Sequence, residues 1–248
     1  MNTLFLAWQE EERTRRWFVI GRLDRTERGF RFQYVNQDWP QIASEYGFES
    51  LLDFPDVGRV YESTRLFPMF ENRLLSRSRP DYGDFLKRLA IDDKDHDPLD
   101  ILARSEGIRA TDSFEVFPKP EPDEQGHYRV VFLARGVRHL PRHVEDVIAK
   151  LTPGDKLDAK FGRENEQDCN ALLVRSDGMQ VGWIPRYLCP DIKRLKGEYP
   201  SSLELRVEQV NLSPAPVQQR LLCSITAPWP QWEPFSDKEF AGLVEQAA

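Results

Sequence analysis

The chain has 248 residues, 40% of them hydrophobic and 30% charged, which is typical of a soluble globular protein with room for two modest domains. No apolar run approaches the length that a bilayer requires, and the N-terminal charges follow the apolar stretch, opposite to a secretory signal. The sequence therefore favours a cytoplasmic protein without a membrane partner. A formal net charge of −7 argues against a nucleic-acid partner for the chain as a whole.

The N-terminal segment predicts three antiparallel strands. Residues 4–8 and 17–23 are apolar runs separated by a charged turn. Residues 29–35 alternate aromatic and polar side chains, as a half-buried strand does. A short helix is expected over residues 39–46.

The next segment has a helical pattern. Residues 67–76 and 80–89 carry apolar side chains at spacings of three and four. A third helix is expected to begin with Asp97 as its N-cap and Pro98 in its first turn. A strand over residues 113–117 closes the segment. Aromatic stripes of this kind are far more often core than ligand site.

The order of these elements, with the stretches LFPMFENRLLS and DPLDILARSEG, resembles the small N-terminal subdomain of HipA-type bacterial toxin kinases over about residues 3–118. The same subdomain occurs as a free-standing protein, HipS, that is antitoxin to a separate kinase. The resemblance implies an α+β domain over residues 1–118 that binds a HipA-type (HipT-like) kinase. The chain itself has no GxxxxGK[ST] phosphate loop, HRD-type catalytic loop or DFG triplet. We therefore expect no enzyme activity and no cofactor.

Residues 119–126 are a proline-rich acidic stretch, expected to be an extended linker. Residues 127–227 then predict a second, β-rich domain. Its expected elements are an opening strand at 130–138, a turn at 152–155, a strand at 156–161, a hairpin of 171–174 and 179–184, a helix after Pro185, and strands near 201–210 and 219–226.

The turn residues PGD, the D-x-N-A segment at 168–171 and the G-x-x-V-G-x-I-P hairpin at 178–185 resemble the HIRAN domain. The resemblance covers about residues 127–227 and implies an OB-like β-barrel that binds DNA, in the best understood members at the 3′ end of a single strand. This segment holds 15 Lys and Arg against 12 Asp and Glu, and it is the only basic part of the chain. So small an excess suits a short, salt-sensitive contact.

A pocket for a DNA end needs a cation for phosphate, a flat side chain for stacking and an acceptor for the terminal hydroxyl. The resemblance puts Arg138 and Arg186 at basic positions and Asp168 at the acidic position. His139 follows the first arginine, and it stands with Leu140 where the end-binding members commonly have aromatic residues.

Asn170 and Trp183 complete the DNA-binding set that we expect. Each has a simpler structural interpretation. Asn170, like Asp168, can cap its turn through hydrogen bonds to backbone groups, and Trp183 can be a core residue of its strand.

The C-terminal part, residues 228–248, begins with the aromatic and proline-rich stretch PWPQWEPF. We expect this stretch to pack against the second domain; the alternative is that it binds a partner. Ser236 to Glu239 form a capping-box pattern that predicts a helix through Phe240 and Leu243.

Two groups of potential metal ligands occur in the sequence, a cluster of carboxylates and a pair of histidines. Clustered carboxylates can hold Mg²⁺ in a nuclease, but a cluster before a helix N-terminus is usually a solvated turn. That cluster consists of Asp92, Asp93, Asp95, His96 and Asp97. His139 and His143 have a helical spacing that Pro141 interrupts. The cysteines, Cys169, Cys189 and Cys223, form no C-x-x-C pair, so neither zinc nor a disulfide framework is indicated.

The sequence favours a non-catalytic adaptor, an antitoxin that binds a HipA-type kinase and contacts DNA, either as a single strand or at a promoter as an operon repressor. One alternative is a single-stranded DNA or 3′-end-binding protein of DNA repair or phage defence, with the first domain as a scaffold. A third hypothesis is an enzyme that cleaves nucleic acid with the acidic cluster.

Overall fold

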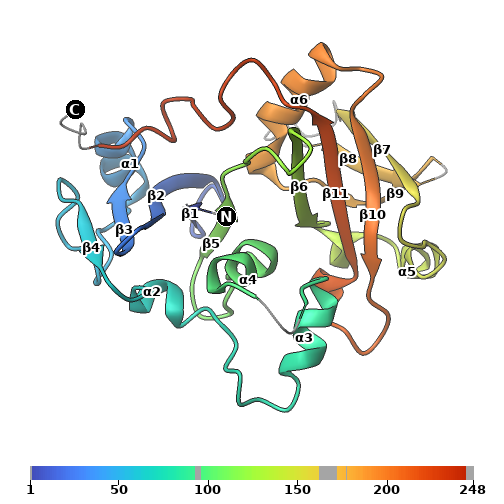
Figure 1. Ribbon diagram of the computed structural model, residues 1–248, viewed down its shortest axis with the longest axis horizontal. Coiled ribbons are helices and arrows are strands. Elements are labelled where there is room, and N and C mark those ends of the chain that lie inside the picture. Colours follow the sequence, from blue (N-terminus) through green and yellow to red (C-terminus); the bar gives the residue numbers. More distant parts are fainter. Residues whose placement is uncertain (1, 93–95, 162–171, 177, 244–248) are drawn as a thin grey trace. The chain divides into compact units, whose positions relative to one another are not determined.

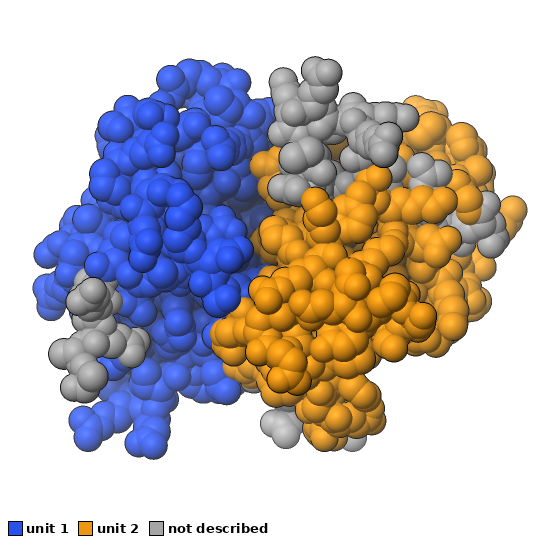
Figure 2. All heavy atoms as spheres, turned by 90° about the horizontal axis from the view of Figure 1, so that it is seen from above, with its two compact units in different colours: residues 1–82, 95–119, 235–248 blue, residues 83–94, 120–234 orange. Residues whose placement is uncertain are grey.

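The computed structural model describes residues 2–92, 96–161, 172–176 and 178–243 (Figure 1). Helices and antiparallel sheets are both present, which confirms the expected α+β class. The chain divides into two compact units, coloured separately in Figure 2. Unit 1 consists of residues 1–82, 95–119 and 235–248, and unit 2 consists of residues 83–94 and 120–234.

Unit 1 is built on a five-stranded antiparallel sheet in the order β4-β3-β2-β1-β5. The three N-terminal strands and the closing strand are confirmed, whereas the short β4 was not predicted. The strands are β1 (Thr3–Gln9), β2 (Trp17–Thr26), β3 (Gly29–Tyr34), β4 (Tyr61–Ser63) and β5 (Phe114–Pro118).

The helices of unit 1 are α1 (Trp39–Tyr46), α2 (Pro68–Glu71) and α4 (Pro98–Ser105) among the described residues. Asp97 caps α4 as predicted, because its side chain accepts a hydrogen bond from the Leu99 N–H at 2.8 Å. The helix predicted over residues 67–76 is confirmed only in its first turn, α2. Arg73 lies beyond it, and its buried guanidinium binds Gly107 O at 2.8 Å and the Asp112 carboxylate at 2.8 Å.

Successive residues of β1 face opposite sides of the sheet, and both sides are covered. Leu4 and Leu6 belong to the main core, which includes residues of all the longer strands and of α4. Phe5 points the other way, and its ring centroid lies 4.9 Å from that of Phe240 and 6.0 Å from that of Phe235. The C-terminal segment therefore completes unit 1.

The helix predicted from the capping box at Ser236 is wrong. The described residues 236–243 form turns, and Gly242 makes an isolated β-bridge with Val35. Phe235 and Phe240 stack on each other at 4.7 Å with an interplanar angle of 9°. Burying two rings against the sheet stabilises this segment more than a short, marginal helix would.

Unit 2 is built on a six-stranded antiparallel sheet in the order β6-β11-β10-β7-β8-β9. The expected strands of residues 127–227 are confirmed, except that the opening strand, predicted over residues 130–138, ends at Leu133, and Arg138 lies in a 3₁₀ turn. They are β6 (His127–Leu133), β7 (Lys156–Phe161), β8 (Leu172–Ser176), β9 (Met179–Trp183), β10 (Glu204–Val210) and β11 (Leu221–Pro228). Among the described pairings the strands do not close into a barrel, and an isolated bridge between Arg135 and Trp183 links the two ends of the sheet.

The helical segments of unit 2 connect these strands. They are α5 (His143–Ile148), α6 (Cys189–Glu198) and the 3₁₀ turns η1 (Val137–His139), η2 (Arg186–Leu188) and η3 (Val217–Gln219). Residues 228–234 of the aromatic and proline-rich stretch belong to this unit, as expected, whereas Phe235 packs in unit 1. Trp229 lies 6.2 Å from Tyr128, and the Trp232 indole N–H donates to the Glu198 carboxylate at 2.9 Å.

The segment around α3 (Tyr82–Arg88) belongs to unit 2 from Gly83 onward, whereas the sequence predicts it in the first domain. Leu89 packs in a cluster with Val131, Leu133 and Leu222 of the six-stranded sheet. None of the helices in the described ranges is both long and apolar enough to cross a membrane.

Candidate nucleic-acid interface

Two segments of unit 2 that carry expected DNA-binding residues lie side by side. Arg135 and Trp183 exchange a pair of backbone hydrogen bonds, of 2.8 Å from Arg135 N to Trp183 O and 3.0 Å from Trp183 N to Arg135 O. The first segment continues into η1, which carries Arg138 and His139. The second continues through Pro185 into η2, which begins with Arg186. The bridge thus brings four of the six predicted residues to one edge of unit 2, where the two ends of the sheet meet.

A glycine makes this close approach possible. Gly136 adopts a left-handed conformation with φ of 68°, and the Trp183 ring lies against it. A Cβ atom at this position would lie 2.4 Å from Cε3 of the indole. Gly182 has a similar role, since a Cβ there would lie 2.9 Å from the Ala134 Cβ. Both glycines set how closely the indole approaches η1.

The side chains at this edge differ in exposure. Trp183 is half-buried, so the indole is neither a full core residue nor a free platform, while Arg138 and His139 are exposed. Arg138 Nε donates a hydrogen bond to His139 Nε2 at 3.0 Å. This contact holds the imidazole ring beside the guanidinium. The arrangement presents a permanent cation and an imidazole ring next to a half-buried indole.

These groups match part of what a nucleic-acid strand needs. A guanidinium forms strong, charge-assisted hydrogen bonds with phosphate oxygens, and aromatic rings stack with bases irrespective of sequence. Arg186 is half-buried at the start of η2. Asp168 and Asn170, the expected acceptors, lie outside the described residues.

The acidic cluster has structural partners in unit 1. Besides capping α4, Asp97 pairs with the Arg25 guanidinium at 2.5 Å. His96 Nε2 lies 2.8 Å from the Tyr82 hydroxyl. Asp93 and Asp95 lie outside the described residues. In the described part of the chain no group of three His, Cys, Asp or Glu side chains could hold a metal ion.

Cys189 and Cys223 are buried, and Cys169 is outside the described residues. Burial raises the pKa of the Cys223 thiol well above its usual range. A protonated, buried thiol is a poor nucleophile, so Cys223 acts as a core residue.

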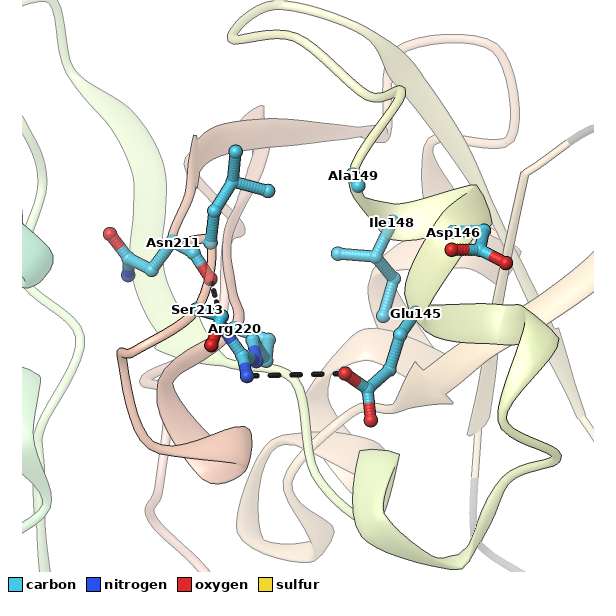
Figure 3. A pocket seen from close by; sticks show the side chains of 8 residues that line it. Glu145, Asp146, Ile148, Ala149, Asn211, Ser213 and Arg220 are labelled. Carbon is cyan, nitrogen blue, oxygen red and sulfur yellow. Dashed lines mark hydrogen bonds and ion pairs between the residues drawn. The ribbon is translucent and has the colours of Figure 1, made fainter.

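A pocket in unit 2 was not predicted from the sequence (Figure 3). It has a cavity volume of about 280 Å³. Its lining residues are Glu145, Asp146, Ile148, Ala149, Asn211, Leu212, Ser213 and Arg220. One signal was available: Arg220 is a charge placed directly before the apolar run Leu221 to Ile225, where a strand buries its side chains.

In comparisons with protein-family models, curated proteins and solved structures, nothing matches this chain. The two family resemblances therefore rest on the residue patterns alone.

Proposed function

We propose that this protein is a non-catalytic adaptor that binds single-stranded DNA through unit 2 and a HipA-type kinase through unit 1. The observation that carries the DNA-binding part is the position of Trp183 beside Arg138 and His139, held by the Arg135–Trp183 backbone pair. The cation can bind one phosphate, the exposed imidazole can stack with one base, and the half-buried indole lies beside them.

We infer that the six strands of unit 2 are an OB-like barrel of the HIRAN type. The strand order and the bridge between the two ends of the sheet support this inference. OB folds bind single strands in a groove lined with cations and aromatic side chains. The same edge of unit 2 would then be the binding groove.

The charge of the chain limits how it can bind DNA. Only residues 127–227 have a positive balance, with 15 Lys and Arg against 12 Asp and Glu. A contact with few phosphates follows, and its affinity should fall with salt by a slope of about −0.7 per phosphate contact for a single strand. A long duplex footprint would need a larger basic surface.

Binding of an oligonucleotide tests this part of the proposal. We would measure fluorescence anisotropy of a labelled single strand with wild type, Arg138→Ala and the control Arg129→Ala. Arg129 is also an exposed arginine of unit 2, but it is paired with Glu208 at 2.9 Å. Losing one charge-assisted contact should weaken binding about tenfold in Arg138→Ala, and Arg129→Ala should bind like wild type. Equal affinity in all three proteins would exclude this interface.

The kinase part of the proposal is supported by the residue pattern of unit 1 and by its α+β fold. The antitoxin interpretation predicts that the full chain copurifies with a coexpressed HipA-type kinase and relieves its toxicity. If coexpression of the chain reduces neither the toxicity of the kinase nor the amount of unbound kinase, the antitoxin part is wrong. The DNA-binding part is unaffected by that result.

The same interface also supports the alternative role in DNA repair or phage defence, which requires DNA binding but no kinase. Blocking the 3′ hydroxyl of the oligonucleotide distinguishes this role from that of the adaptor. A strong preference for the free end supports the repair or defence role, and indifference to the end supports the adaptor.

A further inference from the structure

The pocket of unit 2 contains an arginine with few hydrogen bonds. The Arg220 side chain is only 12% exposed. Its Nη1 donates to Asn211 O at 3.3 Å, and Nε is buried without a hydrogen-bond partner in the part of the chain that the structure describes. A guanidinium has five N–H donors, and each buried donor without an acceptor costs about 1–3 kcal/mol. The Arg220 guanidinium therefore has hydrogen-bonding capacity that the described part of the protein does not use, and its Nη2 faces Glu145 across the pocket.

A carboxylate faces this arginine from the opposite wall (Figure 3). Glu145 Oε2 lies 3.9 Å from Arg220 Nη2, close enough for an ion pair but too far for a hydrogen bond. The Glu145 side chain is 51% exposed. The pocket thus offers donors and acceptors next to each other, and both groups still have hydrogen-bonding capacity.

The wall that holds Arg220 is rigidly bonded. The Asn211 side-chain amide donates to Gln219 O at 2.6 Å and to Arg88 O at 2.9 Å. The Asn211 N–H also donates to Arg220 O at 2.8 Å. These bonds fix the backbone on both sides of the guanidinium, so its position is set before any ligand binds.

Three of the other lining residues, Ile148, Ala149 and Leu212, are apolar. Ile148 is buried at the end of α5, and Ala149 directly follows the helix. Leu212 is 59% exposed and places apolar surface at the pocket. A flat, uncharged ring with a polar edge fits such a site better than a free anion does, because Glu145 and Asp146 would repel an anion.

We propose that this pocket binds one nucleobase and that it prefers guanine. Guanine presents two acceptors, O6 and N7, to a guanidinium, and its N1–H and N2–H donors suit a carboxylate. Adenine carries an amino donor where guanine has O6 and so opposes Arg220. Pyrimidines fill less of a cavity of about 280 Å³.

The pocket adjoins the candidate interface. α5 follows η1 along the chain, and η1, which carries Arg138 and His139, packs against η3, the turn directly before Arg220. A strand whose phosphate is bound by Arg138 can therefore deliver a neighbouring base to this pocket. In that sense the inference rests on the proposed binding of single-stranded nucleic acid.

The test uses the full chain and four labelled dT oligonucleotides that contain dG, dA, dC or dT at one central position. The dG oligonucleotide should bind about tenfold more tightly, as expected for one bidentate contact. Glu145→Gln and Arg220→Lys should lose this preference, while the control Glu208→Gln should keep it. Thermal unfolding checks that each variant is folded. If Arg220→Lys does not fold, the result for Glu145→Gln, a change at an exposed position, decides the test.

The outcomes separate this inference from the proposed function. Equal affinity for the four oligonucleotides, with binding still lost in Arg138→Ala, would overturn the guanine pocket and leave the DNA interface standing. Binding of guanosine that is lost in Glu145→Gln, without any binding of oligonucleotides, would support the pocket and remove the interface. Competition by inorganic phosphate as effective as that by guanosine would identify an anion site and overturn the inference.

Discussion

Replacing Gly136 with alanine tests the contact that positions Trp183. An alanine kept at a φ of 68° would strain the backbone by about 1 kcal/mol. Its Cβ atom would also lie 2.4 Å from the Trp183 indole. Overpacking of this kind adds about 1–3 kcal/mol. The free energy of unfolding of unit 2 should fall by roughly 2–4 kcal/mol in total.

Gly126→Ala is the matched control. Gly126 has a similar φ of 77°, but nothing lies within 4 Å of a Cβ there, so only the backbone strain of about 1 kcal/mol applies. Urea unfolding followed by circular dichroism measures both variants. In a Trp183→Ala background, Gly136→Ala should cost no more than Gly126→Ala, since the clash is gone. If Gly136→Ala and Gly126→Ala destabilise the native protein equally, the indole does not lie against Gly136.

Three further predictions concern unit 1. Arg73→Met should lower the unfolding free energy of unit 1 by about 3 kcal/mol, because the Asp112 carboxylate loses its buried partner. The control Arg79→Met removes an exposed pair and should change this free energy by less than about 1 kcal/mol. Urea unfolding measures both variants. Phe240→Ala should cost about 3 kcal/mol in the same assay, and no change would mean that the C-terminal segment is not docked. The Thr14 backbone N–H, with further hydrogen bonds in the same turn, lowers the pKa of Glu10 to about 2. The stability this gives is complete above about pH 4.5 and is lost as the pH falls toward 2, so Glu10→Gln should flatten the acid limb of a thermal-unfolding profile.

The sequence predicts individual elements of this fold better than their partners. Alternation identified the strands, and the Asp97–Pro98 pair identified the start of α4, because both signals are local. The apolar stripe of α3 showed that one face is buried but not against what. That face packs on the six-stranded sheet of unit 2 through Phe85 and Leu89.

The C-terminal segment shows how tertiary contacts override a local signal. Its capping box is a valid helix start, but a helix of this length is marginal, and stacking of Phe235 with Phe240 on the sheet is worth more. Aromatic residues near a chain end were visible in the sequence. Their partner Phe5, more than 200 positions away, was not.

The candidate site was predictable only in part. Motif spacing pointed to Arg138, His139 and Trp183, but their proximity depends on a backbone bridge beside Gly136 that no local pattern encodes. The Arg220 pocket is assembled from α5 and from the chain around β10 and β11, which lie far apart in the sequence. Such a site requires the fold to be known.

Photo-crosslinking would show which residues of the full chain contact a single strand. The full chain would be irradiated with a single strand containing 5-iodouracil, and the crosslinked peptides would be mapped by mass spectrometry. Crosslinks to His139 or Trp183 are expected, and their yield should fall strongly in Arg138→Ala and persist in Arg129→Ala. Crosslinks confined to peptides of unit 1, or equal yields from both variants, would contradict the proposed interface.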